Sequence, residues 1–207
     1  MIYELPVKPV TLAGELVRLE PLQQEHAQGL YNRGRAASDW NYMPRPCFID
    51  MADTRQWIDE ALAAPSQLPF AIVETGKNRV IGSTRYLNIR REHRSLEIGW
   101  TWLGEEWQRT GINTEMKLLL LTHAFDQLGC VRVEFKTDAR NLRSQRALER
   151  IGAQREGVMR NHMIVQGNFV RDSVYFSVID SDWPQAVSYT HLRAHETRYT
   201  ISYDVFW

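Results

Sequence analysis

Residues 97–103 read Glu97-Ile98-Gly99-Trp100-Thr101-Trp102-Leu103, and the sequence WQRTGINTE follows at residues 107–115, before an apolar run at residues 116–121. This order indicates a strand, a glycine-containing turn and a helix. Such a turn points backbone N–H groups outward where the helix dipole is positive, so it predicts a binding place for a phosphate or pyrophosphate. It has neither the Lys-Ser/Thr pair of a P-loop nor the triple glycine of a dinucleotide-binding turn, which argues against ATP hydrolysis and NAD chemistry.

A second strand–turn–helix unit follows. Residues 131–137 alternate apolar and polar side chains, as a half-buried strand does, and residues 142–151 are expected to form a helix that Gly152 closes. Asn141 precedes this helix as a candidate N-cap, and Ser144 lies in its first turn.

The N-terminal half also contains recognisable elements. We expect a strand at 16–22, then a helix to about residue 35, a helix over 53–64 with Asp53 as its N-cap, and a hairpin of strands 70–74 and 80–89. The helix after the turn is expected to begin near Thr114.

The spacing Gln108-x-x-Gly111-x-Asn113 resembles the acyl-CoA signature of the GNAT superfamily of N-acetyltransferases, Gln/Arg-x-x-Gly-x-Gly/Ala. Asn113 departs from that signature, because the family usually has a small residue where the pyrophosphate approaches the backbone. Asn tolerates unusual backbone angles, so the turn can still form. The unit Asn141-x-x-Ser144 resembles the segment that flanks the pantetheine arm in the family.

Ordered similarity extends over residues 16–179 and is greatest to the subgroup that includes the ribosomal-protein N-terminal acetyltransferases. It implies an α/β (α+β) GNAT fold: a mixed, mostly antiparallel sheet with a splayed parallel central strand pair and helices on both faces. It also implies one acyltransferase domain over residues 1–186. Residues 188–197 resemble translated sequencing-adapter DNA, so we expect 187–207 to be a non-native tail.

The resemblance implies that acetyl-CoA is the acyl donor and that no metal takes part. Backbone groups of the strand before the turn are expected to hold the pantetheine and the thioester, while the turn holds the pyrophosphate. The residues assigned to acetyl-CoA in this way are Trp102, Leu103, Gln108, Arg109, Thr110, Gly111, Ile112, Asn113, Thr114, Asn141 and Ser144.

Acyl transfer to an amine requires a base, because the nucleophile must be a neutral amine. Glu97 and Glu134 lie on the two strands that the resemblance makes parallel neighbours, and either carboxylate could accept the proton; either could equally be a salt-bridged strand residue. Alternation places Glu97 on one face with Thr101, and Trp102 on the other. Ser144 matches a hydroxyl that assists the leaving thiolate in the subgroup, and is equally well explained as a first-turn polar residue.

The acceptor side is less defined. In this family the loop between the first two helices borders the acceptor groove, which by resemblance assigns Trp40 and Tyr42 to the substrate; His162 is added because its strand could face the same cleft. For each of these the alternative is simple packing. The substrate is expected to be a small-molecule amine or a protein N-terminus.

The composition limits the classes of partner. With 207 residues, 43% apolar, and 25 Lys+Arg against 25 Asp+Glu, the chain can bury a core and has no overall charge that would attract nucleic acid or an anionic membrane. Cys47 and Cys130 lack metal-ligand spacing and favour free thiols in a reducing compartment. No signal peptide or membrane-spanning stretch is recognised, so we expect a cytoplasmic protein; a homodimer stays open.

Two functions fit the sequence. The first is an N-acetyltransferase in which the amine attacks acetyl-CoA directly in a ternary complex. The alternative is a non-catalytic GNAT-fold module that binds acyl-CoA or a partner, with Asn113 weakening the phosphate site.

Overall fold

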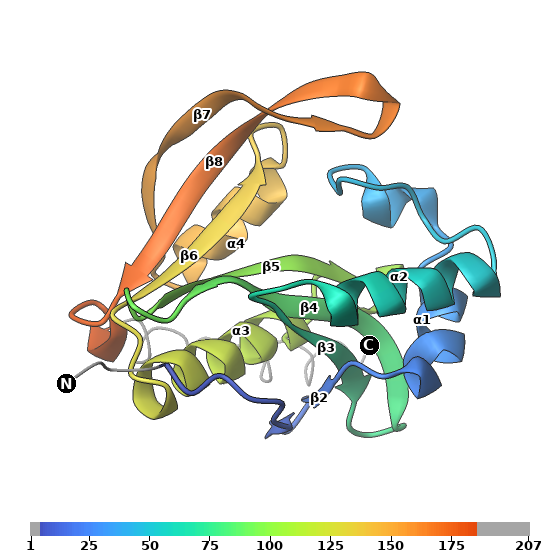
Figure 1. Ribbon diagram of the computed structural model, residues 1–207, viewed down its shortest axis with the longest axis horizontal. Coiled ribbons are helices and arrows are strands. Elements are labelled where there is room, and N and C mark those ends of the chain that lie inside the picture. Colours follow the sequence, from blue (N-terminus) through green and yellow to red (C-terminus); the bar gives the residue numbers. More distant parts are fainter. Residues whose placement is uncertain (1–4, 186–207) are drawn as a thin grey trace, which may run out of the picture.

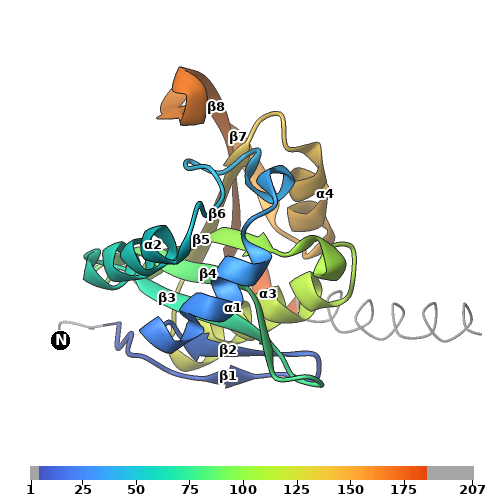
Figure 2. The ribbon, with the colours of Figure 1, turned by 90° about the vertical axis from the view of Figure 1, so that its right-hand side faces the viewer.

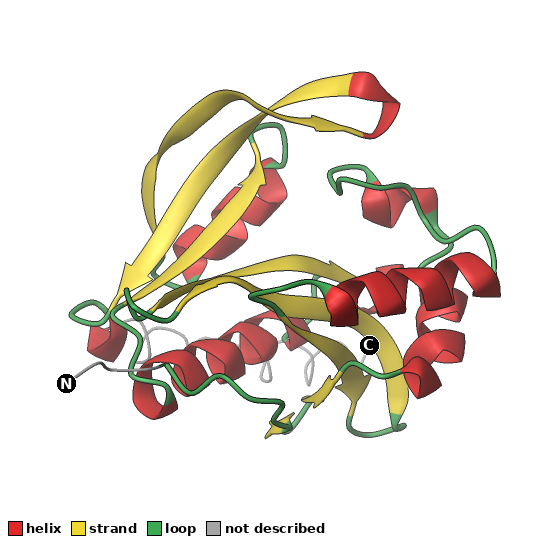
Figure 3. Ribbon diagram, in the orientation of Figure 1, coloured by secondary structure: helices red, strands yellow, loops and turns green. Residues whose placement is uncertain are grey.

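The computed structural model describes residues 5–185, and the expected tail at 187–207 lies outside the described residues. Figures 1 and 3 show its helices and strands. The strands are β1 (Leu12–Ala13), β2 (Val17–Pro21), β3 (Leu68–Glu74), β4 (Arg79–Arg90), β5 (Ser95–Leu103), β6 (Arg132–Asp138), β7 (Gln154–Val165) and β8 (Phe169–Ile179). The α-helices are α1 (Ala27–Arg33), α2 (Met51–Ala63), α3 (Ile112–Thr122) and α4 (Leu142–Arg150). Short 3₁₀ turns lie at Gln24–His26, Ala37–Trp40, Glu105–Trp107 and Gln166–Asn168, and α3 continues as a π-helical turn at His123–Gln127.

The strands form one sheet in the order β1-β2-β3-β4-β5-β6-β8-β7. Among the described strands, β5 and β6 are the one parallel pair, and their pairing ends at Glu97 opposite Glu134. Both strands continue beyond that pair, so they diverge, and β6 rises away from β5 together with β8 (Figure 1). The predicted mixed sheet with a splayed parallel pair is confirmed.

A bulge interrupts β5 just past the point of divergence. Trp100 has a left-handed backbone with φ of 51°, and the register between β4 and β5 shifts beside it. The expected strict alternation is therefore wrong beyond Gly99. Thr101 contacts Lys117 of α3, while Trp102 packs on the opposite face, against the core beneath α1 and α2.

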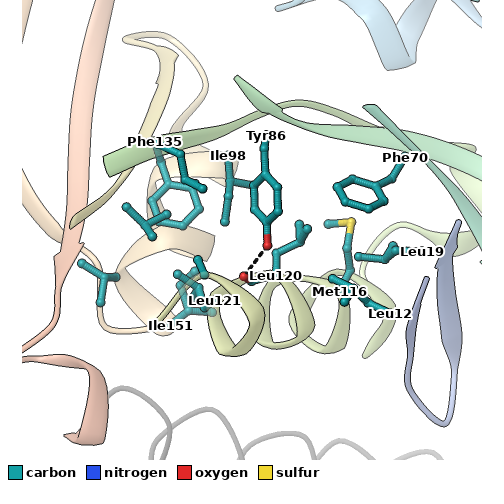
Figure 4. Packing of buried hydrophobic residues seen from close by; sticks show 14 of the residues in the cluster. Leu12, Leu19, Phe70, Tyr86, Ile98, Met116, Leu120, Leu121, Phe135 and Ile151 are labelled. Atoms are coloured by element: carbon teal, nitrogen blue, oxygen red, sulfur yellow. Dashed lines mark hydrogen bonds between the residues drawn. The ribbon is translucent and has the colours of Figure 1, made fainter. Parts of the chain in front are cut away.

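Helices cover both faces of the sheet, as expected, and α2 and α3 lie on opposite sides of β3 and β4 (Figure 2). The larger core lies between the sheet and α3 (Figure 4). In it, the hydroxyl of Tyr86 donates a 2.6 Å hydrogen bond to the carbonyl oxygen of Leu120, which satisfies both buried polar groups. A second core of aromatic residues around Trp40 and Trp57 lies beneath α1 and α2.

Two helix starts differ from the expected ones. Helix α2 begins at Met51, and its N-cap is Asp50, whose carboxylate accepts a 2.8 Å hydrogen bond from the N–H of Asp53. Asp53 is thus in the first turn rather than at the cap. Helix α3 begins at Ile112, two residues before Thr114. In the described residues, no helix is both long and apolar enough to cross a membrane.

Candidate active site

A cavity of about 390 Å³ occupies the gap between the diverging strands β5 and β6. Its walls come from the loop at 38–44, from β5, from the turn at 108–114, from β6 and from α4. Nine of the residues assigned to acetyl-CoA from the sequence line it: Trp102, Leu103, Gln108, Arg109, Thr110, Asn113, Thr114, Asn141 and Ser144. Gly111 and Ile112 belong to the same turn but lie outside the lining. Ile112 is buried, and a Cβ added at Gly111 would meet Leu16 at 3.2 Å.

The turn between β5 and α3 is fixed by the side chain of Gln108. Its amide nitrogen donates to Asp39 Oδ1 at 2.6 Å and to the carbonyl of Leu103 at 2.9 Å, while its amide oxygen accepts from Arg143 Nη1 at 2.7 Å. Gln108 therefore ties the turn to the loop before α2 and to α4. Burial raises the pKa of Asp39 against the opposing hydrogen bond from Gln108.

The end of the cavity at the start of α3 is suited to an anion. The first N–H groups of a helix have no partner within the helix, and the helix dipole is positive there. Arg109, Arg143 and Arg150 also line the cavity. A phosphate or another anion would fit this end of the cavity by charge.

The start of α4 holds Asn141 and Ser144 together. The side-chain oxygen of Asn141 accepts a 3.0 Å hydrogen bond from the backbone N–H of Ser144, so the expected N-cap is confirmed. Both residues line the cavity. The cap thereby fixes the position of Ser144 in the cavity wall. The role of the Ser144 hydroxyl in assisting the leaving thiolate stays a prediction.

Glu97 lies at the narrow end of the gap and is 2% exposed. Its Oε2 accepts a 2.8 Å hydrogen bond from Asn88 Nδ2, and Lys136 Nζ lies 3.6 Å away. Its neighbours Leu96 and Ile98 pack in the α3 core, so Glu97 points to the other face of the sheet. A Cβ at Gly99 would lie 3.2 Å from Glu97 Oε1, so the glycine leaves room for the carboxylate.

Glu134 has different surroundings. Its carboxylate is ion-paired to Arg90 and Arg132, both at 2.8 Å, and it is not among the residues that line the cavity. Burial raises the pKa of Glu134, but the hydrogen bonds from the two arginines outweigh this effect and leave the pKa below its usual value. The structure thus separates two carboxylates that the sequence alone keeps as alternative bases.

The acceptor candidates also separate. Tyr42 lines the cavity, whereas Trp40 is 1% exposed and packs between Phe48 and Trp102. His162 lies outside the lining and contacts Ser173 and Tyr175. Trp40 supports the loop from beneath, and His162 lies outside the lining. Of these three residues, only Tyr42 therefore reaches the cavity.

Several cavity residues were missed from the sequence: Asp39, Lys117, Lys136, Asp138 and Arg171. Lys117 is the one charged residue in the run at 116–121. A charged residue within an apolar run is a signal of a functional site, but the run was interpreted only as part of a helix. Arg171 donates to the carbonyl of Tyr42 at 3.3 Å, and such a contact between distant segments has no local sequence signal.

The chain is similar in sequence and in structure to known acetyltransferases. A family model described as "Acetyltransferase (GNAT) domain" matches residues 17–154. A GCN5-related N-acetyltransferase structure from Brucella melitensis superposes with a TM-score of 0.88 at 29% identity, covering 94% of this chain and 89% of that one. The N-acetyltransferase p20 of Bacillus licheniformis, itself uncharacterized, is 26% identical over 84% of this chain and 98% of its own length.

YdaF of Bacillus subtilis, which has a provisional designation as a ribosomal N-acetyltransferase, is 34% identical to this chain. That match spans 46% of this chain and 51% of YdaF, so it covers about half of that protein. The family model spans most of the fold, including the turn and both diverging strands. The chain therefore belongs to the GNAT acetyltransferase family.

Proposed function

We propose that this chain transfers an acetyl group from acetyl-CoA to a primary amine, by direct attack of the amine in a ternary complex. The observation that carries this proposal is the gap beyond the Glu97–Glu134 pair, which joins an anion-attracting turn to a buried carboxylate through one cavity. A long donor with phosphates at one end and a thioester at the other fits that arrangement.

The residues present suit acetyl-CoA. The turn and the start of α3 would hold the pyrophosphate, with Arg109 and Arg143 beside it. Between Gly99 and Leu103, β5 has no partner in β6, so the backbone groups of Gly99–Trp102 on the edge away from β4 are the proposed partners of the pantetheine amides and the acyl oxygen; the carbonyl of Leu103 already accepts from Gln108. When bound, acetyl-CoA supplies the activated acyl group.

Glu97 is the proposed base. Its carboxylate lies at the acceptor side of the gap and accepts the amine's proton directly or through water, while the hydrogen bond from Asn88 fixes its orientation. Tyr42 and Arg171 border the same side of the cavity, so they are the proposed contacts of the acceptor.

A binding titration followed by a thiol-release assay tests the proposal. Isothermal titration should show acetyl-CoA binding, and CoA release should be measured over a panel of N-terminal peptides, polyamines, amino acids and amino-bearing drugs. N-terminal peptides of ribosomal proteins belong in the panel because of the designation of YdaF. Binding without release on any amine would favour the non-catalytic module, and no binding would refute both.

A further inference from the structure

Lys117 is a buried amine at the floor of the gap, and the proposed transfer has not yet used it. It lies on α3, four residues after Asn113, and is 6% exposed. Its Nζ donates a 3.1 Å hydrogen bond to Thr101 Oγ1 on β5 and lies 5.2 Å from the centre of the Phe135 ring on β6. The amine thus bridges the two strands just where they diverge.

Glu97 and Lys117 approach the gap from opposite faces of the sheet. Glu97 points to the face away from α3, whereas Lys117 rises from α3 itself, and both line the cavity. An acyl group in the gap would therefore have a carboxylate on its acceptor side and an amine on its donor side.

Packing does not explain this lysine. Within residues 5–185 it forms no ion pair within 4 Å, and burial of an unpaired ammonium opposes folding. Burial lowers the pKa of Lys117 to about 7, although the charge of Glu97 acts in the opposite direction. An amine of this acidity can release a proton near neutral pH, which the hydroxyl of Ser144 cannot do.

Resting on the acetyl transfer proposed above, we propose that Lys117 is the general acid that protonates the sulfur of CoA as the acyl group leaves. The amine nitrogen forms a bond to the acyl carbon, and the carbon–sulfur bond breaks with its electron pair on sulfur. The sulfur takes a proton from the Lys117 ammonium, and Glu97 takes the proton lost by the amine. Exchange with water then returns a proton to Lys117 and removes one from Glu97.

Other ionisable groups around the gap bear on its pH dependence. On the strands these are Glu97, Lys136, Asp138 and Arg171; on the loop, turn and helices they are Asp39, Tyr42, Arg109, Arg143 and Arg150. Tyr86 and His123 contact each other in the core beside α3 and do not line the cavity.

Side-chain ¹⁵N NMR provides a test that does not depend on activity, because the chain has four lysines, at positions 8, 77, 117 and 136. The Nζ signal of Lys117, assigned with Lys117→Met, is titrated in complexes with CoA and with desulfo-CoA. The two ligands differ only in the sulfur, so the pKa of Lys117 is expected to differ between the two complexes if that sulfur lies next to Nζ. The pKa of Lys77 should be the same in both complexes. An identical pKa in both complexes would overturn the proposal.

Kinetics supply the second arm. Lys117→Met and Lys117→Gln should each lower kcat by about 100-fold while the Kd for acetyl-CoA changes less than threefold, since a proton donor acts in the transition state. The fall of kcat above the pKa of Lys117 in the wild type should be absent from both variants. The exposed Lys77→Met is the matched control. Normal kcat in both Lys117 variants would refute the role of Lys117 alone, whereas a wild type without acetyl-CoA binding would refute the proposed function.

Discussion

Glu97 and Glu134 face one another at the last parallel pair, yet their surroundings give them different chemistry. Glu97 has an amide donor and a lysine 3.6 Å away, and it lines the cavity; Glu134 is held by two arginines outside the lining. A carboxylate whose charge is neutralised by two guanidinium groups is a weaker base, because those groups favour its ionised form.

Exchange of each carboxylate for its amide separates the two assignments. We expect Glu97→Gln to lower turnover by about 100-fold or more with little change in the Kd for acetyl-CoA. Glu134→Gln should keep turnover within about threefold and should instead lower the unfolding midpoint, since it leaves Arg90 and Arg132 without their shared carboxylate. Thiol release at saturating substrate and thermal unfolding measure these effects. A larger loss of turnover in Glu134→Gln would reverse the assignment.

The buried amine of Lys117 predicts a pH-dependent stability. Its pKa is about 7 in the folded chain against about 10.4 in an unfolded one. Between these two pH values the unfolded state binds more protons than the folded state. The contribution of this group to the free energy of unfolding of the wild type therefore rises with pH in this range, as the cost of burying the amine decreases. Lys117→Met should therefore be more stable than the wild type at pH 7, by about 4 kcal/mol at most, and this advantage should shrink toward pH 10.

Urea unfolding of both proteins across that pH range measures the difference. Lys77→Met, at an exposed turn position, should differ from the wild type by a constant amount. A stability difference between Lys117→Met and the wild type that does not change with pH would show that Lys117 does not lose its proton on folding.

At the scale of elements, the β5–turn–α3 unit is where the sequence was most informative. The glycine-containing turn and the following helix gave the family resemblance, and the structure places most of that turn along the cavity. The sequence failed where tertiary contacts decide the geometry. The bulge at Trp100 reverses the faces of Thr101 and Trp102, and nothing in a local apolar–polar pattern signals that reversal. Similarly, the sequence pattern predicts Asp53 as the cap of α2, whereas the extended backbone of Asp50 makes that residue the cap.

Substitution of Asn113 by Asp tests whether the N-terminus of α3 binds phosphate. The added carboxylate should stabilise the helix but weaken the binding of acetyl-CoA. Asn113→Asp is nearly isosteric, and a negative charge at a helix N-terminus stabilises the helix by about 0.3–1 kcal/mol. The same charge lines the cavity where phosphates are expected, so we predict that the Kd for acetyl-CoA rises at least tenfold, or about 1.4 kcal/mol.

The control is Asn78→Asp, which adds the same charge at an exposed turn between β3 and β4, where the side chain already accepts a hydrogen bond from Arg18. Its Kd for acetyl-CoA should equal that of the wild type. An unchanged Kd in Asn113→Asp, measured by titration calorimetry, would place the phosphates elsewhere.

For the whole molecule, the end of the cavity that is proposed to take the acceptor depends on segments that are far apart in the chain. Gln166, in the turn between β7 and β8, donates to the carbonyl of Trp40 at 2.7 Å, and Arg171 donates to that of Tyr42. The loop at 38–44 is thereby held against the β7–β8 hairpin, which lies opposite it in Figure 1. A sequence pattern identifies each segment separately, but only the assembled sheet brings them together, which is why Arg171 was not predicted.

The last prediction concerns the extent of the domain. Trp183 closes the described core: its ring stacks on Phe125 at 5.2 Å, and its Nε1 donates to Asp126 at 2.7 Å. We therefore expect a chain that ends at Ala186 to keep the unfolding midpoint and the acetyl-CoA Kd of the full chain, since the described core and the cavity lining lie within it. Trp183→Ala should instead lose about 3 kcal/mol or more of stability, because it leaves a cavity beside Phe125. Thermal unfolding and titration calorimetry of the three proteins test this. If the shortened chain melts at a lower temperature or aggregates while the full chain does not, residues 187–207 belong to the domain.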